Sequence, residues 1–384
     1  MNQLQISTQE ISKYKDTITQ FLKDNTLYDC LAHHNQLIVL DQTFTCWEVF
    51  QIFVEENLEE TLFWNSDISN YDGVFSHSDL IKVLLKLYEN AYNNKSSLQQ
   101  SGPLFNVIEE ESEDQEESIQ KIQSQKQQPS ELNDDQKLRL IYEMKTISIR
   151  QWNRILKDDL ESSIGFVQGR NDERLYDACV KIVKSGTSRL FVVDPETLMF
   201  QGVIHQKDIL SFLIKGFTQY LGAILKQQNN ILSQHQISIK VFFSTYNRSK
   251  EIITCKENET VYQVFYTMMH NHKSYVIPIV NNNDQYLGQI NRRDIILIIK
   301  NGLFELFSQT ASQLLVFLSN EKARIPAYLY YSKQFFSMDQ TIKEVVENLV
   351  LSDSSALICL AENKQIQAII TISDILRFIL KDAY

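Results

Sequence analysis

One short pattern occurs four times along this chain. Each copy has a hydrophobic run, a polar turn, a second hydrophobic run, and then an aspartate that opens an apolar stretch with helical spacing. The four aspartates are Asp79, Asp208, Asp294 and Asp374. Each copy predicts two β-strands followed by a helix. Because one such unit leaves a face uncovered, repeats of this kind should pair, and the sequence predicts an α/β fold made of tandem repeats.

Each strand pair should also be preceded by an amphipathic helix. Residues 260–269, upstream of the third pair, place apolar side chains at helical intervals. One repeat is therefore expected to run helix, strand, strand, helix.

A long polar insert separates the first repeat from the second. Within it, Glu109–Glu117 contains seven acidic residues and no basic one, and the flanking residues are rich in Gln, Ser and Asn. Such a run repels itself and stays solvated, so residues 93–137 are expected to be a disordered insert. An acidic docking tract is the alternative.

Composition excludes several classes of protein. The net charge of −11 argues against nucleic acid as a partner, because phosphate binding requires clustered Lys and Arg. No apolar run approaches the roughly 20 residues of a membrane span, and the N-terminus lacks the features of a secretory signal. We therefore expect no membrane contact and a cytoplasmic protein, with the nucleus as a second location. The five scattered cysteines suggest buried, reduced thiols.

The repeat unit resembles the CBS domain, and four copies in one chain resemble the gamma subunit of AMP-activated protein kinase. The resemblance is carried by Phe21–Leu31 with Leu37–Asp41, by Thr245–Tyr246, and by the connector Ile141–Asn153 with its Ile-Tyr-Glu and Ile-x-x-Trp motifs. It covers about residues 18–92 and 138–384. The expected divisions are an N-terminal extension (1–17), CBS repeat 1 (18–92), the insert (93–137), a connector helix (138–158), CBS repeat 2 (159–228), CBS repeat 3 (238–303) and CBS repeat 4 (308–384).

This resemblance implies two Bateman modules, each a pair of CBS repeats, arranged as a flattened disk. It also implies AMP, ADP or ATP bound in clefts between paired repeats. The implied partners are an alpha-type kinase catalytic subunit and a beta-type scaffold subunit.

The motif residues have the chemistry that such a ligand requires. An aspartate in the first turn of a helix can accept both ribose hydroxyls, and a Ser or Thr beside it can help hold phosphate at the helix N-terminus. The nucleotide-binding candidates are Ser76, Asp79, Asp208, Asp294, Thr371, Ser373 and Asp374 from the repeats, with Thr245, Arg189 and Lys207 implied by the family. Ser/Thr-x-x-Asp is also a capping-box pattern, and both roles are open to the same residues.

Other positions depart from the family. Glu59 stands where an Arg is expected, Ser188 where a His is expected, and Ser355 with Ala356 in place of a His-Arg pair. Each lost charge-assisted contact costs on the order of 1.5 to 3 kcal/mol. In the third repeat Asn291 replaces Ser/Thr. Arg292 and Arg293 either compensate for this replacement or form a solvated helix start, and the sequence favours the solvated helix start.

No motif for catalysis, a metal or a cofactor occurs in the sequence. It has no GxGxxG, GxxxxGK[ST], GxSxG or HExxH pattern, and adjacent His33 and His34 cannot face one ligand point. We therefore expect a protein that is not an enzyme and has no cofactor. The expected function is energy sensing as a kinase regulatory subunit, and the alternative is a degenerate CBS scaffold that binds proteins but no nucleotide.

Overall fold

The structure is a computed structural model. It describes residues 8–31, 38–93, 132–158, 167–197, 199–225, 238–245, 252–271, 275–323, 334–352 and 355–380. Most of the predicted insert, residues 94–131, lies outside the described residues.

Four units of the same construction follow one another along the chain. The first consists of β1 (Val39–Asp41), α3 (Cys46–Glu55), β2 (Glu60–Asn65), β3 (Asn70–Ser76) and α4 (His77–Asn93). The second consists of β4 (Gln168–Arg170), α8 (Leu175–Ser185), β5 (Arg189–Val193), β6 (Phe200–His205) and α9 (Gln206–Leu225).

The third and fourth units vary this plan slightly. The third consists of β7 (Cys255–Lys256), α11 (Val261–Tyr266), a π-helical turn (Thr267–Asn271), β8 (Val276–Val280), β9 (Tyr286–Asn291), a 3₁₀ turn (Arg292–Asp294) and α12 (Ile295–Lys300). The fourth consists of α14 (Ile342–Leu351), β10 (Ala356–Leu360), β11 (Ile366–Thr371) and α15 (Ile372–Ile379).

The sheets share one pairing scheme as well as one element order. In the first three units a short strand pairs in parallel with the middle strand, which pairs antiparallel with the last. In the fourth, a parallel bridge between Phe335 and Ile358 takes the place of the short strand. The register shifts at the same point of every middle strand, after Phe63, Val192, Ile279 and Cys359. The repetition seen in the sequence is therefore a repetition of backbone geometry.

Three of the four units begin their first helix with a capping threonine, and α8 of the second unit begins after Arg174 without a side-chain cap. Thr45, Thr260 and Thr341 cap α3, α11 and α14, and each hydroxyl accepts a hydrogen bond from the backbone N–H three residues later. These bonds satisfy amide groups that a helix start would otherwise leave unpaired. The helix expected over residues 260–269 is α11 continued by the π-helical turn.

Further helices lie between and beside the repeats. They are α1 (Thr8–Asp24), α2 (Leu27–Cys30), α6 (Asp134–Thr146), α7 (Ile149–Asp158), α10 (Ile239–Thr245), a 3₁₀ turn (Phe304–Ser308) and α13 (Ala311–Ala323). The connector predicted as one helix is thus two, α6 and α7, and Trp152 of α7 is fully buried.

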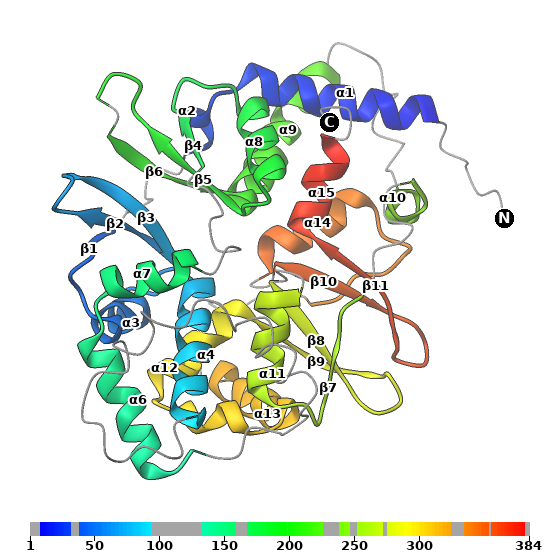
Figure 1. The fold of residues 1–384 in the computed structure, drawn as a ribbon. Coiled ribbons are helices and arrows are strands. Elements are labelled where there is room, and N and C mark those ends of the chain that lie inside the picture. Colours follow the sequence, from blue (N-terminus) through cyan, green and yellow to red (C-terminus); the bar gives the residue numbers. More distant parts are fainter. Residues whose placement is uncertain are drawn as a thin grey trace.

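The hydrophobic core is divided into two large clusters. One joins the first and third repeats with α6 and α7, and the other joins the second and fourth repeats with α1 and α2. A small third cluster packs the first and second sheets together through Leu62, Phe191 and Val203. Figure 1 shows the first two sheets on one side of the molecule and the last two on the other, with one group of helices toward the top of the view and another toward the bottom.

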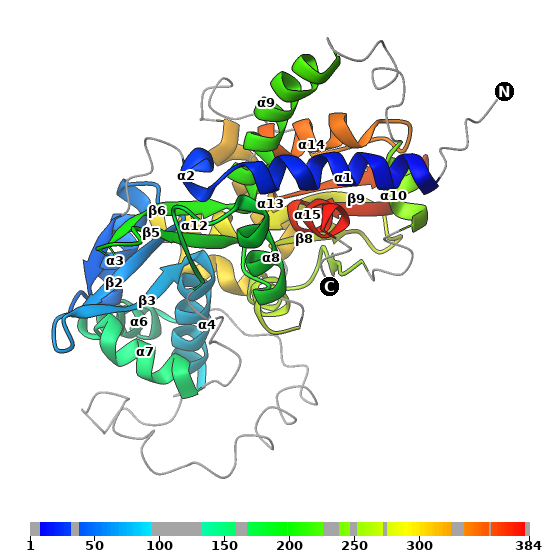
Figure 2. The same ribbon diagram turned by 90° about the horizontal axis from the view of Figure 1, so that it is seen from above.

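The first and second repeats therefore meet through their sheets, while the first and third, and the second and fourth, meet through their helices. The third and fourth sheets also touch, because Tyr286 donates its backbone N–H to the Lys364 carbonyl at 2.9 Å. Seen from above, in Figure 2, α1 runs across α9 and α15, so the N-terminal helix covers the second and fourth repeats. This arrangement brings the end of β9 beside the start of α4, and the start of α9 beside that of α15.

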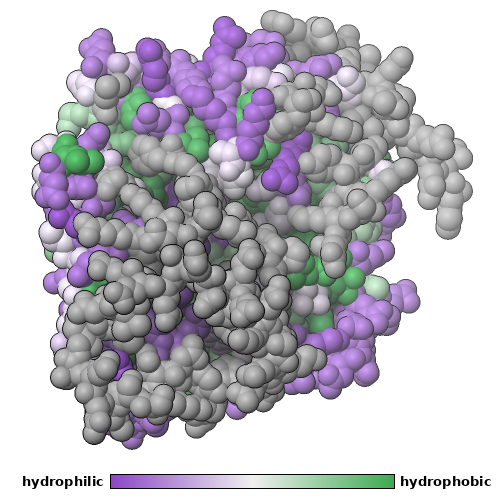
Figure 3. Space-filling view, in the orientation of Figure 1, coloured by the Kyte–Doolittle hydropathy of each residue, from purple (hydrophilic) through white to green (hydrophobic). Residues whose placement is uncertain are grey.

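The surface facing the viewer in Figure 3 is mostly hydrophilic where it is described, with small hydrophobic patches. Among the described helices, none has both the length and the apolarity needed to cross a bilayer. All five cysteines are buried free thiols, which confirms the prediction of buried cysteines.

Candidate functional site

The four motif aspartates have the same local geometry. Oδ2 of each accepts a hydrogen bond from the backbone N–H of the residue three positions earlier, at 2.8 to 2.9 Å. The donors are Ser76, His205, Asn291 and Thr371. Each aspartate lies in the first turn of its helix, where a negative charge is favoured by the helix dipole. The capping role considered from the sequence is therefore present in all four repeats.

Hydroxyl groups reinforce this cap in the first and fourth repeats. Ser76 Oγ donates to Asp79 at 2.8 Å, and Thr371 Oγ1 donates to Asp374 at 2.6 Å. In return the backbone N–H of Asp374 donates to Thr371 Oγ1 at 3.2 Å.

The four carboxylates differ in their surroundings. Asp79 and Asp208 are half-buried, whereas Asp294 and Asp374 are buried. Lys322 of α13 lies 2.9 Å from the second carboxylate oxygen of Asp294, so both oxygens of that aspartate have partners within the chain.

The motif of the third repeat meets the motif of the first. Arg292 donates from Nη1 to Ser78 Oγ at 2.7 Å, and its guanidinium lies 4.2 Å from the centre of the Tyr275 ring. Only 8% of Arg292 is exposed, so the prediction of a solvated helix start is wrong for this residue. The Tyr275 ring, the Ser78 hydroxyl and the nearby charge of Asp79 replace the water that a buried guanidinium loses.

The motif of the second repeat meets that of the fourth in the same way. Ser373 Oγ donates to Gln206 Oε1 at 2.6 Å, and Lys207 Nζ donates to the Ser352 carbonyl at 2.8 Å. Both contacts join α9 to the fourth repeat. The motif helices therefore meet in pairs.

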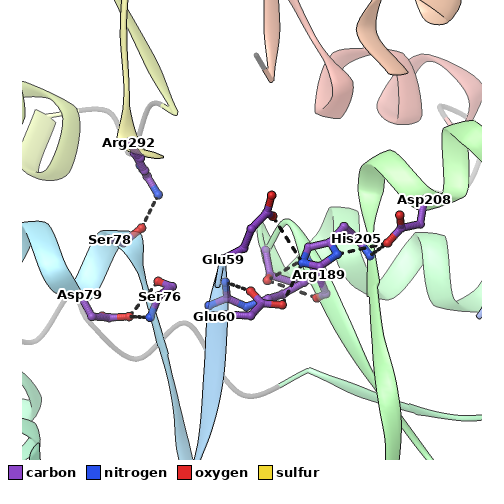
Figure 4. A network of polar contacts seen from close by, with 10 residues as sticks. Glu59, Glu60, Ser76, Ser78, Asp79, Arg189, His205, Asp208 and Arg292 are labelled. Atoms are coloured by element: carbon purple, nitrogen blue, oxygen red, sulfur yellow. Dashed lines mark hydrogen bonds and ion pairs between the residues drawn. The ribbon is translucent and has the colours of Figure 1, made fainter. Parts of the chain in front are cut away.

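A network of charged groups joins the first and second repeats (Figure 4). Arg189, at the start of β5, forms an ion pair with Oε2 of Glu60, at the start of β2. His205, at the end of β6, lies 2.9 Å from Glu60 Oε1 and 3.1 Å from Asp208 Oδ2. The exposed carboxylate of Glu59 lies 3.7 Å from the same imidazole.

These neighbours decide the charge of each group in the network. Burial by itself lowers the pKa of His205, but the carboxylates of Asp208, Glu60 and Glu59 outweigh it and raise that pKa to about 10. Burial raises the pKa of Glu60, yet Arg189 and His205 more than reverse this and leave it lowered. At neutral pH His205 is therefore a cation, and Glu60 is an anion placed between two cations.

Comparison with known proteins gives these repeats a family. The profile of the CBS domain matches residues 170–215 and 247–301, which lie in the second and third repeats. This chain carries CBS domains. It is 20% identical over 97% of its length to a 5'-AMP-activated protein kinase subunit gamma of Dictyostelium discoideum, and 21% identical over 95% to that of Saccharomyces cerevisiae.

The alignments cover these relatives to different extents. The chain spans about half of the Dictyostelium protein, 54%, and 93% of the yeast protein. A crystal structure from Methanocaldococcus jannaschii, described as a proposed archaeal homologue of the gamma subunit, superposes with a TM-score of 0.54 at 13% identity. That superposition covers 90% of this chain and 97% of the archaeal one, and it supports the fold of four CBS repeats.

The predicted site residues thus fall into groups. Ser76, Asp79, Arg189 and Asp208 lie toward the junction drawn in Figure 4. Lys207 and Ser373 lie at the contact between the second and fourth CBS repeats, with Thr371 and Asp374 at the start of α15. Thr245 ends α10, and its side chain lies outside the described residues. A role of these residues in nucleotide binding stays a prediction.

Sequence reasoning did not select three residues that the fold brings to this centre. Glu60, His205 and Arg292 were left out of the candidate set, although each neighbours a motif position. Glu60, and not Glu59 as expected from the sequence, occupies the strand position equivalent to Arg189, since each pairs with the residue that opens the next motif, Ser76 or His205. A register comparison of the four repeats would have indicated this charge reversal.

Proposed function

We propose that this chain is a non-catalytic regulatory subunit of an AMP-activated or Snf1-type protein kinase that binds AMP, ADP or ATP between its CBS repeats. The observation that carries the proposal is that four equivalent aspartates open four helices whose first turns meet in pairs. That placement would set ribose-binding carboxylates beside helix N-termini suited to phosphate. The similarity to gamma subunits along nearly the whole chain supports the same conclusion.

Three cations lie near these helix starts, each with partners inside the chain. Arg189 and Lys207 are the two basic residues that the family resemblance selects, and Arg292 is a third that the fold adds. A bound nucleotide would replace the contacts that these three side chains now make within the chain. Differential affinity of AMP and ATP for two states of the complex would then regulate the kinase.

The partners proposed are an alpha-type catalytic subunit and a beta-type scaffold subunit. Regulation of this kind requires partners that carry the kinase activity. The proposed location is the cytoplasm, with the nucleus as a second location.

A second candidate is a CBS scaffold that binds proteins but no nucleotide. Two observations favour it: Lys322 already forms an ion pair with Asp294, and Glu60 already forms one with Arg189. In this case the motif aspartates would serve only as helix caps.

Calorimetric titration of the full chain with AMP, ADP and ATP separates the two candidates. We expect binding that Asp374→Ala weakens by tenfold or more. Asp29→Ala is the matched control, because Thr26 and Asp29 form the same capping pattern on α2 with bonds of 2.7 and 2.8 Å. Absence of heat, or equal effects of the two substitutions, would favour the scaffold.

A further inference from the structure

Glu60 and Arg189 occupy equivalent positions in two CBS repeats that pack sheet against sheet. Each is the first residue of its middle strand, and each pairs with the residue that opens the following helix motif. The cluster of Leu62, Phe191 and Val203 holds these two sheets together. The ion pair between Glu60 and Arg189 is therefore fixed by packing and does not depend on flexible surface side chains.

Glu60 contacts two cations with its two oxygens. Oε2 pairs with Arg189, and Oε1 lies 2.9 Å from Nε2 of His205. Only 6% of the Glu60 side chain is exposed, against 58% for Glu59. A buried carboxylate between a guanidinium and an imidazolium lies where an oxygen of a bound phosphate would contact the same two cations.

The other sheet pair has uncharged residues at the two equivalent positions. The positions equivalent to Glu60 and Arg189 are Val276 in the third repeat and Ala356 in the fourth, as the strand registers show. Neither side chain carries a charge. The internal anion is thus specific to the junction of the first and second repeats.

We propose that Glu60 is an intramolecular counter-anion that occupies the anion position of Arg189 and His205, and so disfavours phosphate-bearing ligands at this junction. Its consequence for nucleotide selectivity rests on the proposed function. A ligand with several phosphates must displace Glu60, whereas a ligand that needs only Asp79 or Asp208 is not opposed. Glu60 is then a specificity-determining residue of the first two repeats.

The direct test uses inorganic pyrophosphate and the full chain, so that it does not depend on nucleotide recognition. We expect Glu60→Gln, which keeps the shape and removes the charge, to strengthen pyrophosphate binding by about tenfold. Adding Arg189→Gln to that variant should remove the gain. Glu59→Gln is the matched control, because Glu59 is adjacent but exposed, and it should change the dissociation constant by less than about twofold.

Equal pyrophosphate binding by the wild type and Glu60→Gln would overturn the proposal, as would a gain that persists without Arg189. A second measurement does not require the Glu60→Gln variants to fold. Arg189→Gln in the wild-type background should leave pyrophosphate binding unchanged, because Glu60 already neutralises this cation. A tenfold weakening there would show that Arg189 is open to external anions and would equally overturn the idea.

The two proposals fail in different ways. If no variant binds AMP or ATP but Glu60→Gln gains pyrophosphate binding through Arg189, the nucleotide-sensor function is wrong and the counter-anion stands. If the wild type binds ATP through Arg189 as tightly as Glu60→Gln does, the sensor stands and the counter-anion is wrong.

Discussion

Arg292 of the third CBS repeat donates a hydrogen bond of 2.7 Å to the hydroxyl of Ser78 in the first turn of α4. The two residues are 214 positions apart in the chain, and the contact joins repeats that are not neighbours in sequence. It belongs to a helix-to-helix interface, whereas the ion pair of Glu60 with Arg189 belongs to a sheet-to-sheet interface. Both interfaces thus carry charged groups close to the motif helices.

Replacing Arg292 should destabilise the protein. Arg292→Met loses the bond to Ser78 and the contact with the Tyr275 ring, and we expect a loss of about 2 kcal/mol in the free energy of unfolding. Denaturation with urea measures this. Arg293→Ala is the control, because Arg293 bonds the exposed amide of Asn57 and should cost less than about 1 kcal/mol. Similar losses of unfolding free energy for both variants would mean that the contacts of Arg292 with Ser78 and Tyr275 add no particular stability.

Stability should fall on the alkaline side because of His205. Its pKa rises from 6.5 in the unfolded chain to about 10 in the fold, so its contribution is complete below pH 6.5 and is lost as the pH rises toward 10. Glu60 and Asp208, whose pKa values are lowered, contribute above their unfolded values and lose that contribution in acid. Urea denaturation from pH 6.5 to 10 should show a steeper decline for the wild type than for His205→Gln.

The half-buried His77 should not contribute to that pH dependence. Burial and the charge of Arg293 lower its pKa to about 4, so in the fold it is neutral throughout the alkaline range. Parallel pH profiles for the wild type and His205→Gln would contradict the charge assigned to His205.

The contact between the first two sheets should depend on Leu62. This side chain is fully buried in the cluster that joins the sheets, so Leu62→Ala should cost about 2 to 5 kcal/mol. Ile68, in the turn after β2, is 59% exposed, and Ile68→Ala should stay within about 0.5 kcal/mol. Thermal unfolding compares the two, and a small effect at Leu62 would mean that the sheets are not tightly packed.

Gly216 of α9 should resist substitution because of Phe21 of α1. A Cβ atom at Gly216 would lie 2.5 Å from Cζ of the buried Phe21 ring. Gly216→Ala should therefore destabilise by about 1 to 3 kcal/mol, although alanine favours a helix by about 1 kcal/mol. Calorimetric melting of Gly216→Ala and of the double variant with Phe21→Leu tests the cause. If the smaller leucine does not recover part of the loss, the clash is not the reason.

Local structure followed from the sequence alone. The aspartate three residues after a strand end, as in Thr371 and Asp374, predicts a capped helix because the groups that bond lie within one turn. The helix expected over residues 260–269, the strand pairs and the fourfold repetition were predicted for the same reason, since each depends on side-chain spacing over a few residues.

The tertiary structure decided which repeats meet and which charges face each other. Arg292 was expected to be solvated, and it is buried because Ser78 and Tyr275 surround it. Glu60 carries no local signal that it faces Arg189, 129 positions away. Such contacts depend on how whole sheets and helices pack, and a pattern of neighbouring residues does not contain that information. The sequence therefore determined the unit and its motifs, and the packing of the units determined the charge at their centre.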